Sequence, residues 1–224
     1  MQLIKRLRLE KVKRRFTGIV LFGAWYLLTF FWMEQRRVPI HIIHMEIDRK
    51  IPFCEYFIIP YMLWFVFVIG TVLYFMVFVD DDREYYKLVF TLAVGMVMFV
   101  LISYFYPNGH SLRPRLYGDS IFIEAVRILY KVDTPTNILP SLHVFNAIAC
   151  GVALLKNGKV KKYRIFCFFT VALVISIILS TVFLKQHSTL DVIVASMMNL
   201  VCYGVIYVKE EARHVQRIWV RKEL

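Results

Sequence analysis

The 224-residue sequence predicts an all-α, polytopic membrane protein with six transmembrane helices and both termini in the cytoplasm. Hydrophobic residues make up 59% of the chain and the mean hydropathy is +0.59, whereas soluble domains are roughly 45–50% apolar. The apolar residues form six runs, and the basic residues gather in the gaps between them. The net charge of +12 therefore indicates membrane topology and contact with anionic membrane lipids, and argues against nucleic acid as a partner.

Each spanning helix needs about 20 mostly apolar residues, and six segments fit, some of them marginally. The fourth is the weakest, and the charged stretch "KNGKVKKYR" closes it as a short connection between helices. The chain is interpreted as one membrane domain, 1–224, with a basic N-terminal segment, 1–15, and a tail, 209–224. The predicted spans are Phe16–Met33, Phe57–Val79, Leu88–Tyr106, Ser141–Leu155, Ile165–Leu184 and Leu190–Val208.

The distribution of lysine and arginine predicts the orientation of the six spans. The N-terminus, the second and fourth loops and the tail together carry 19 of the 28 Lys and Arg residues. Basic segments remain on the cytoplasmic side of a membrane. The first, third and fifth loops are therefore predicted to face outward from the cell membrane.

The third loop contains a predicted amphipathic helix in "DSIFIEAVRILYKVD". Glu124, Arg127 and Lys131 share one helical face, and Ile121 and Ile128 lie largely elsewhere, which is typical of a helix lying on the membrane surface. The first outer loop, "HIIHMEIDRKIP", has a similar but shorter pattern.

Three polar clusters fall at the predicted outer surface. The first, "HSLRPRLY", follows the third span, and the second, "NILPSLHVFNA", begins the fourth. The third, "FLKQHSTLDVIVAS", joins the fifth span to the sixth. An ionised residue at the centre of a spanning helix costs about 2.5–3.5 kcal/mol, so a position at the membrane rim explains these residues better. Topology thus brings the three clusters to one depth.

The spacing within these clusters indicates phosphate chemistry. His187 and Asp191 are four apart, so on a helix the carboxylate can fix one ring nitrogen and leave the other as a nucleophile. Ser141 follows Pro140 at a predicted N-cap, where free N–H groups suit an anion. Arg113 adds a planar guanidinium group, whose paired N–H donors match phosphate oxygens.

Each of these residues also has a structural interpretation. Lys185 can be an interfacial lysine that extends to the headgroups, and Asp191 can form a structural pair. His187 can bond to backbone, Arg113 can contact lipid headgroups, and Ser141 can be a cap alone. His110 is interpreted as a plain loop histidine rather than a phosphate contact.

Together the clusters resemble the motifs of the type 2 phosphatidic acid phosphatase superfamily, K-x6-R-P, P-S-G-H and S-R-x5-H-x3-D. The chain has Arg113–Pro114, "PSLH" at 140–143, and "STVFLKQHSTLD" at 180–191. It departs from the pattern where the motifs have Lys, Gly and Arg, at Tyr106, Leu142 and Thr181. Lys185 and Arg115 are the predicted substitutes for the two cations. On a helical path, Lys185 would lie one turn beyond Thr181 on the same face.

The resemblance implies that His187 attacks phosphorus, that Asp191 orients it and that His143 protonates the leaving oxygen. Arg113 and Ser141, with Lys185 and Arg115, would hold the phosphate, and no metal or other cofactor is implied. Strings such as "DTPTN" and "KQH" resemble a branch that includes inositol phosphorylceramide synthases and their bacterial relatives. Two functions therefore stay open: hydrolysis of a lipid phosphate, either phosphatidate-like or prenyl diphosphate, and transfer of a phospho-headgroup to a lipid or polyol hydroxyl.

A third alternative is a non-catalytic transporter or scaffold, which the rim position of the polar residues and the lack of an inverted repeat disfavour. The four cysteines show no metal-binding spacing. The sequence does not indicate an oligomeric state.

Overall fold

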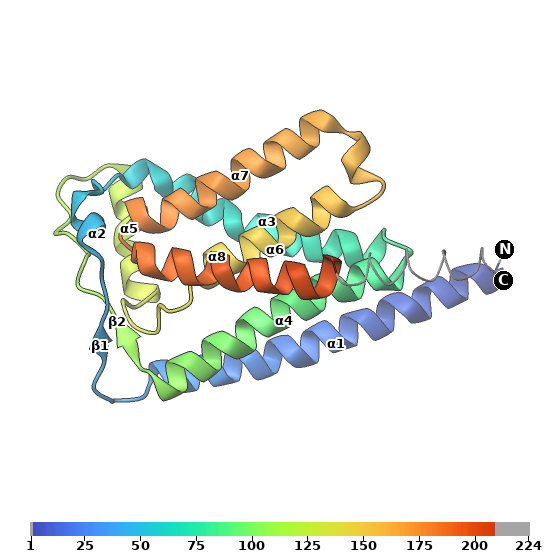
Figure 1. Ribbon diagram of the computed structural model, residues 1–224, viewed down its shortest axis with the longest axis horizontal. Helices are drawn as coiled ribbons and strands as arrows, with labels where there is room; N and C mark the ends of the chain where they lie inside the picture. Colours follow the sequence, from blue (N-terminus) through green and yellow to red (C-terminus); the bar gives the residue numbers. More distant parts are fainter. Residues whose placement is uncertain (1, 209–224) are drawn as a thin grey trace.

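A computed structural model describes residues 2–208. Long helices run side by side and form an elongated bundle, with the short elements gathered at one end (Figure 1). The predicted tail, 209–224, lies outside the described residues. The long elements are α1 (Gln2–Glu34), α3 (Ile58–Val77), α4 (Asp82–Phe105), α6 (Leu142–Lys156), α7 (Arg164–Phe183) and α8 (Thr189–Tyr203), which continues as the π-helix η3 (Gly204–Val208).

Within residues 2–208, five helices are long and apolar enough to cross a membrane, in agreement with a multi-pass membrane protein. They correspond to five of the six predicted spans: Arg8–Glu34, Glu55–Val77, Asp82–Phe105, Arg164–Phe183 and Thr189–Val208. The sixth, α6, has 15 residues. At 1.5 Å per residue it is about 22 Å long, whereas the hydrocarbon core is about 30 Å thick. Five of the six predicted spans are therefore helices of spanning length, and the fourth, which was the weakest in the sequence, is a shorter helix.

Helix α6 lies at the centre of the bundle, in contact with α3, α4, α7 and α8. It is more buried than the other long helices, which explains why it need not match the thickness of the lipid. Gly95 of α4 permits a close approach, because a Cβ there would lie 2.3 Å from the ring of Phe145 on α6. The short helix η2 (Val160–Lys162) then joins α6 to α7 within the predicted charged connection.

The short elements at the left end of Figure 1 link the first outer loop to the third. The strands β1 (His41–Ile42) and β2 (Asn108–Gly109) pair in parallel, and the short helices α2 (Glu46–Lys50) and η1 (Glu55–Phe57) follow β1. The side chain of Asn108 accepts hydrogen bonds from two backbone N–H groups, of Ile138 and Leu139, shortly before α6 begins. These contacts fix the segment that leads into α6.

The predicted amphipathic helix of the third loop is present as α5 (Ile121–Val132). Ser120 caps its N-terminus by accepting a hydrogen bond from the N–H of Ile123. Its buried face, which includes Val126, packs against the start of α3 and against Leu184. The buried face of α5 thus meets protein, and the position of this helix on a membrane surface remains a prediction.

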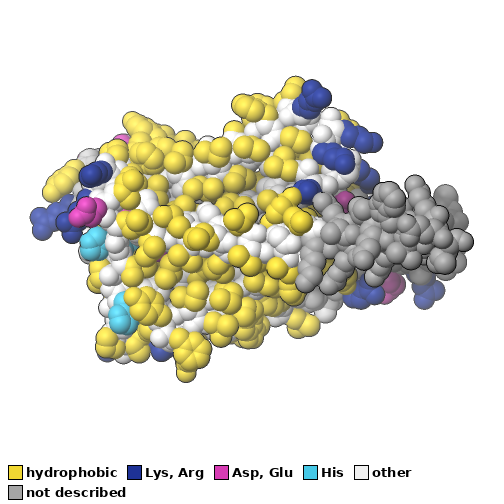
Figure 2. Space-filling model, viewed as in Figure 1, with side chains coloured by type: hydrophobic (Ala, Val, Ile, Leu, Met, Phe, Trp, Pro, Cys, Tyr) yellow, Lys and Arg dark blue, Asp and Glu magenta, His cyan; other side chains and the backbone are white. Residues whose placement is uncertain are grey.

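The surface agrees with the predicted membrane position. Figure 2 shows hydrophobic side chains along the sides of the bundle, whereas charged side chains lie near its two ends and histidines at the left end. Largely exposed aliphatic and aromatic residues such as Leu28, Phe105, Ile165 and Leu200 belong to the long helices. In water such a surface would drive aggregation, whereas in lipid it is the ordinary exterior of a helical bundle.

Candidate active site

The turn between α7 and α8 places the third cluster. Helix α7 ends at Phe183, and the N–H groups of Lys185 and Gln186 donate to the carbonyls of Val182 and Thr181, at 3.2 Å and 3.0 Å. These two bonds form a Schellman motif with Lys185 at the left-handed position, where its φ is 53°. The prediction that Lys185 continues the helical face of Thr181 is therefore wrong, because the chain reverses between them.

His187 and Asp191 form the contact that their spacing predicts. Their Nδ1 and Oδ2 atoms lie 3.3 Å apart, and both residues are buried. The same Oδ2 accepts a hydrogen bond of 2.9 Å from the N–H of Ser188, which is the N-cap of α8. A carboxylate at Nδ1 fixes the ring as the tautomer with its proton on Nδ1, and the lone pair is then on Nε2.

The start of α6 carries the second cluster. Ser141 is fully buried and is the N-cap, because its hydroxyl accepts a hydrogen bond from the N–H of Val144 at 3.4 Å. The N–H of Ser141 donates to the carbonyl of Asp191 at 3.5 Å, which connects α6 directly to α8. The N-cap prediction for Ser141 is confirmed.

His143 lies between two aromatic rings of α3. Its ring centroid is 4.4 Å from that of Tyr61 and 4.3 Å from that of Trp64. Its Nε2 is buried and has no hydrogen-bond partner within residues 2–208. Its centroid is also 5.8 Å from that of His187, with the two rings tilted at 59°. The two predicted histidines are therefore close neighbours.

Arg113 is held by the third loop and by the α7–α8 turn. Its guanidinium donates to the carbonyls of Tyr130 and Asp133, at 3.0 Å and 2.6 Å, and to the side-chain oxygen of Gln186. It also stacks over the ring of Tyr130, and its Nε is buried without a partner within the described part of the chain. Most of its donors are thus occupied by protein. Arg115, by contrast, is exposed.

Lys185 contacts the first outer loop. Its ammonium group donates to the backbone carbonyls of Asp48, at 2.6 Å, and Ile51. These carbonyls lie at the C-terminal end of α2, where a cation complements unpaired acceptors. Burial lowers the pKa of Lys185, and the nearby charge of Asp48 opposes this effect. Lys185 is therefore directed toward the C-terminal end of α2, and its contact with phosphate remains a prediction.

Asp48 is a buried carboxylate that the sequence analysis did not identify. It accepts hydrogen bonds from the N–H of Met45, the hydroxyl of Ser188, and both the N–H and the hydroxyl of Thr189, at 2.6–2.8 Å. Burial alone raises the pKa of this carboxyl, but these donors outweigh it and hold the pKa below its usual value. Asp48 thereby fixes the residues that directly follow His187.

His110 is a second buried contact of this turn. Its Nε2 lies 2.9 Å from the carbonyl of Gln186, and its Nδ1 accepts a hydrogen bond from the N–H of Leu112. The ring is therefore neutral, with its proton on Nε2. Burial lowers the pKa of His110 to about 4, against the raising effect of the Gln186 bond. This geometry agrees with a structural loop histidine.

Tyr61, Trp64 and Asp48 were missed because no local pattern identifies them. Tyr61 and Trp64 are part of an apolar run that would look the same in any spanning helix, and Asp48 is one charged residue in a charged loop. At Tyr106, where the superfamily pattern has lysine, the side chain is half-exposed and stacks on His41 at 4.4 Å.

The fold and this site define a class of protein. It is a multi-pass membrane protein in which the N-terminal ends of α6 and α8 bring the His187–Asp191 pair close to His143. A comparison with protein families gives a match to the PAP2 superfamily over residues 46–205, more than half of the chain. The chain belongs to this superfamily, which confirms the resemblance to the type 2 phosphatidic acid phosphatases. No curated protein and no solved structure matches the chain. Membership supports a phosphatase-type activity, of a phosphoesterase or a phosphotransferase.

Proposed function

We propose that this protein is a membrane lipid phosphate phosphatase that acts through a phosphohistidine at His187. The observation that carries this proposal is the pairing of His187 with Asp191 while its ring faces His143 at 5.8 Å. A nucleophile must lie about 3 Å from phosphorus, and a general acid needs hydrogen-bond reach of the leaving oxygen. At this separation both rings lie within reach of one phosphoryl group bound beside them.

In the first half of the reaction, Nε2 of His187 attacks phosphorus. The N–P bond forms while the bond from phosphorus to the lipid oxygen breaks, and His143 gives its proton to that oxygen. Asp191 accepts the hydrogen bond from Nδ1 and stabilises the positive charge that develops on the ring.

In the second half, water attacks phosphorus, His143 takes the proton of the water and the N–P bond breaks. The equatorial oxygens would be held by the start of α6, through Ser141 and the N–H groups of its first turn, and by Arg113. Phosphoryl transfer depends mainly on positioning and charge stabilisation. This scheme assigns no step to a metal ion, so we expect activity to persist in a chelator.

The proposed site faces outward from the cell membrane. The support is the distribution of lysine and arginine, 19 of 28 on the side opposite the three clusters. The lipid tail would lie along the bundle, and the phosphate would enter at the end that carries α2 and α5. An outward site would act on lipid phosphates of the outer leaflet.

Phosphate release by the purified protein in detergent with EDTA tests this proposal. The substrates are phosphatidate and a prenyl diphosphate, and the variants are His187→Ala and His143→Gln. We expect His187→Ala to abolish release and His143→Gln to reduce it about 10²–10⁴-fold. The matched control is His41→Ala, an exposed histidine at the same end, which should retain activity. Full activity in His187→Ala would refute the mechanism.

A phosphotransferase is the second candidate, in which a hydroxyl replaces water in the second half. A pocket on the water side of the α7–α8 turn favours it, because a substrate group beyond phosphorus would need such a space. Product analysis in the presence of lipid and polyol alcohols distinguishes the two. Free phosphate as the sole product would exclude transfer to the alcohols tested.

A further inference from the structure

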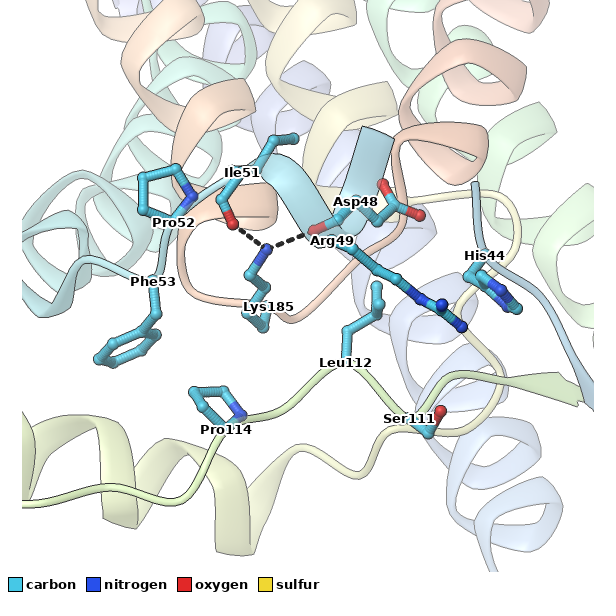
Figure 3. Close-up of a pocket in the computed structure, with 10 residues that line it drawn as sticks. All are labelled: His44, Asp48, Arg49, Ile51, Pro52, Phe53, Ser111, Leu112, Pro114 and Lys185. Carbon is cyan, nitrogen blue, oxygen red and sulfur yellow. Dashed lines mark hydrogen bonds between the residues drawn. The ribbon is translucent and has the colours of Figure 1, made fainter. Parts of the chain in front are cut away.

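A pocket of about 460 Å³ lies between the first outer loop and the third. Figure 3 shows α2 and the segment after it on one side, the segment 111–114 on the other, and Lys185 between them. The lining residues share a position outside the long helices: His44, Asp48, Arg49, Ile51, Pro52, Phe53, Ser111, Leu112, Pro114 and Lys185. A ligand in this pocket therefore lies beyond the lipid-facing part of the bundle.

The pocket adjoins the proposed active site without containing its histidines. Neither His143 nor His187 lines it. Lys185 does, and only Gln186 separates it from His187 in the sequence, so the pocket and the proposed nucleophile belong to the same turn. A substrate that ends at its phosphate would leave the pocket filled with water. A substrate with a head group beyond the phosphate, or an acceptor alcohol, would occupy the pocket.

The charge of the pocket is positive. The carboxylate of Asp48 is already engaged by four protein donors, so it offers little attraction to a ligand. Lys185 gives two of its three N–H donors to carbonyls, which leaves one. Arg49 is exposed and makes no side-chain hydrogen bond or ion pair within residues 2–208. Its guanidinium extends past Leu112 toward His44 and is available to a ligand (Figure 3).

The volume of the pocket fits a ligand larger than a single ion. Sites for small molecules have volumes of about 300–1,000 Å³, and this pocket lies in the lower part of that range. Ser111 adds a hydroxyl, and the proline and leucine side chains provide an apolar wall. This combination suits a small, anionic, hydroxyl-bearing molecule of the size of a polyol phosphate.

We propose that this pocket is a subsite for an anionic polyol head group, bound mainly by Arg49 and by the remaining donor of Lys185. The catalytic role of this subsite rests on the proposed function, because the subsite would hold the part of the substrate attached to the reacting phosphorus. Binding itself does not require turnover, so the two can be tested separately.

The test is titration calorimetry of the purified full-length protein in detergent, with glycerol 3-phosphate, inorganic phosphate and glycerol as probes. We expect glycerol 3-phosphate to bind more tightly than inorganic phosphate, and glycerol to bind more weakly than both. Arg49→Gln should weaken the binding of glycerol 3-phosphate about tenfold, the loss expected for one charged hydrogen bond. The matched control is Lys50→Gln, because Lys50 is exposed on the same helix but does not line the pocket.

A second variant, Ser111→Tyr, fills the pocket without removing a charge and should also weaken glycerol 3-phosphate binding. Thermal unfolding of each variant shows whether it is folded. Wild-type affinity in both Arg49→Gln and Ser111→Tyr would overturn the proposal, and so would an equal loss in Lys50→Gln. Equal affinities for inorganic phosphate and glycerol 3-phosphate would overturn the assignment of a head group.

The variant His187→Ala separates this inference from the proposed function. Since His187 does not line the pocket, this variant should bind glycerol 3-phosphate as the wild type does. Arg49-dependent binding without any phosphate release by the wild type would support the pocket and refute the phosphatase. Phosphate release with binding that is insensitive to Arg49 would refute the pocket alone.

Discussion

Asp48→Asn removes the charge of the carboxylate that connects α2 to the start of α8, with little change of shape. The two hydroxyls that donate to Asp48, from Ser188 and Thr189, can rotate and accept from the new amide. The N–H groups of Met45 and Thr189 cannot. One of them loses its acceptor, because each bonds a different oxygen of Asp48. An unsatisfied buried N–H costs about 1–3 kcal/mol, so we expect a loss of about 2 kcal/mol.

The pH dependence gives this prediction a second readout. The pKa of Asp48 is held below its usual value in the folded protein. Its stabilising contribution is therefore present above the unfolded-state pKa of about 3.9 and is lost as pH falls through the lower folded value. The difference in stability between wild type and Asp48→Asn should be constant from pH 7 to 5. It should shrink below about pH 4.

Thermal unfolding in detergent, followed by circular dichroism, measures both effects, and Asp48→Ala should lose roughly twice as much as Asp48→Asn. Glu46→Gln is the matched control, because Glu46 is an exposed carboxylate in the same short helix. A stability of Asp48→Asn within about 0.5 kcal/mol of wild type, the range of ordinary surface changes, would refute this account of the turn. An equal loss in Glu46→Gln would do the same.

Three further changes test other contacts. Gly95→Ala should lower stability by about 1–3 kcal/mol, because the new Cβ would lie 2.3 Å from the buried ring of Phe145; an unchanged unfolding midpoint would contradict this packing. Lys185→Gly should be more stable than Lys185→Ala by about 1 kcal/mol, because both lose the ammonium but only glycine relieves the φ of 53°; equal midpoints would count against the left-handed turn. Because the pKa of His110 is lowered to about 4, its neutral form stabilises the fold above about pH 6.5 and wild type should lose about 2 kcal/mol between pH 7 and pH 5. The same loss in His110→Gln would show that another group titrates.

The helices could be predicted because length and hydropathy are local properties. Five apolar runs correspond to helices of spanning length, and α5 lies within the predicted amphipathic segment. Two of these helices begin earlier than expected, α1 at Gln2 and α4 at Asp82, because their polar first turns continue the helix beyond the apolar run. The short fourth helix shows the limit of this reasoning. Hydropathy predicts what lipid requires, but α6 is surrounded by protein, and its length is set by its neighbours.

The candidate site was predictable where spacing along one element decides a contact. The spacing of His187 and Asp191 predicted their bond, and the serine after Pro140 predicted the N-cap. The directions of Lys185 and Arg113 were not predictable. Lys185 follows a reversal of the chain, and the partners of Arg113 lie 17 to 73 residues away in the sequence. Contacts of this kind depend on how loops meet in space, which no local pattern encodes.

The positions of the cations bear on what the proposed enzyme would act on. Tyr106 and Thr181 occupy the places of two cations in the superfamily motifs, and Lys185 gives two of its three N–H donors to carbonyls at the end of α2. Near His187, the charge of a phosphate would be met by the start of α6, equivalent to about half a positive charge, and by Arg113. Arg49 and Lys185 lie farther out, in the pocket. The positive charge of the protein is thus divided between the surroundings of His187 and the pocket. If the pocket binds an anionic head group as proposed, this division would suit the phosphotransferase alternative, whose substrate or acceptor carries negative charge in both places.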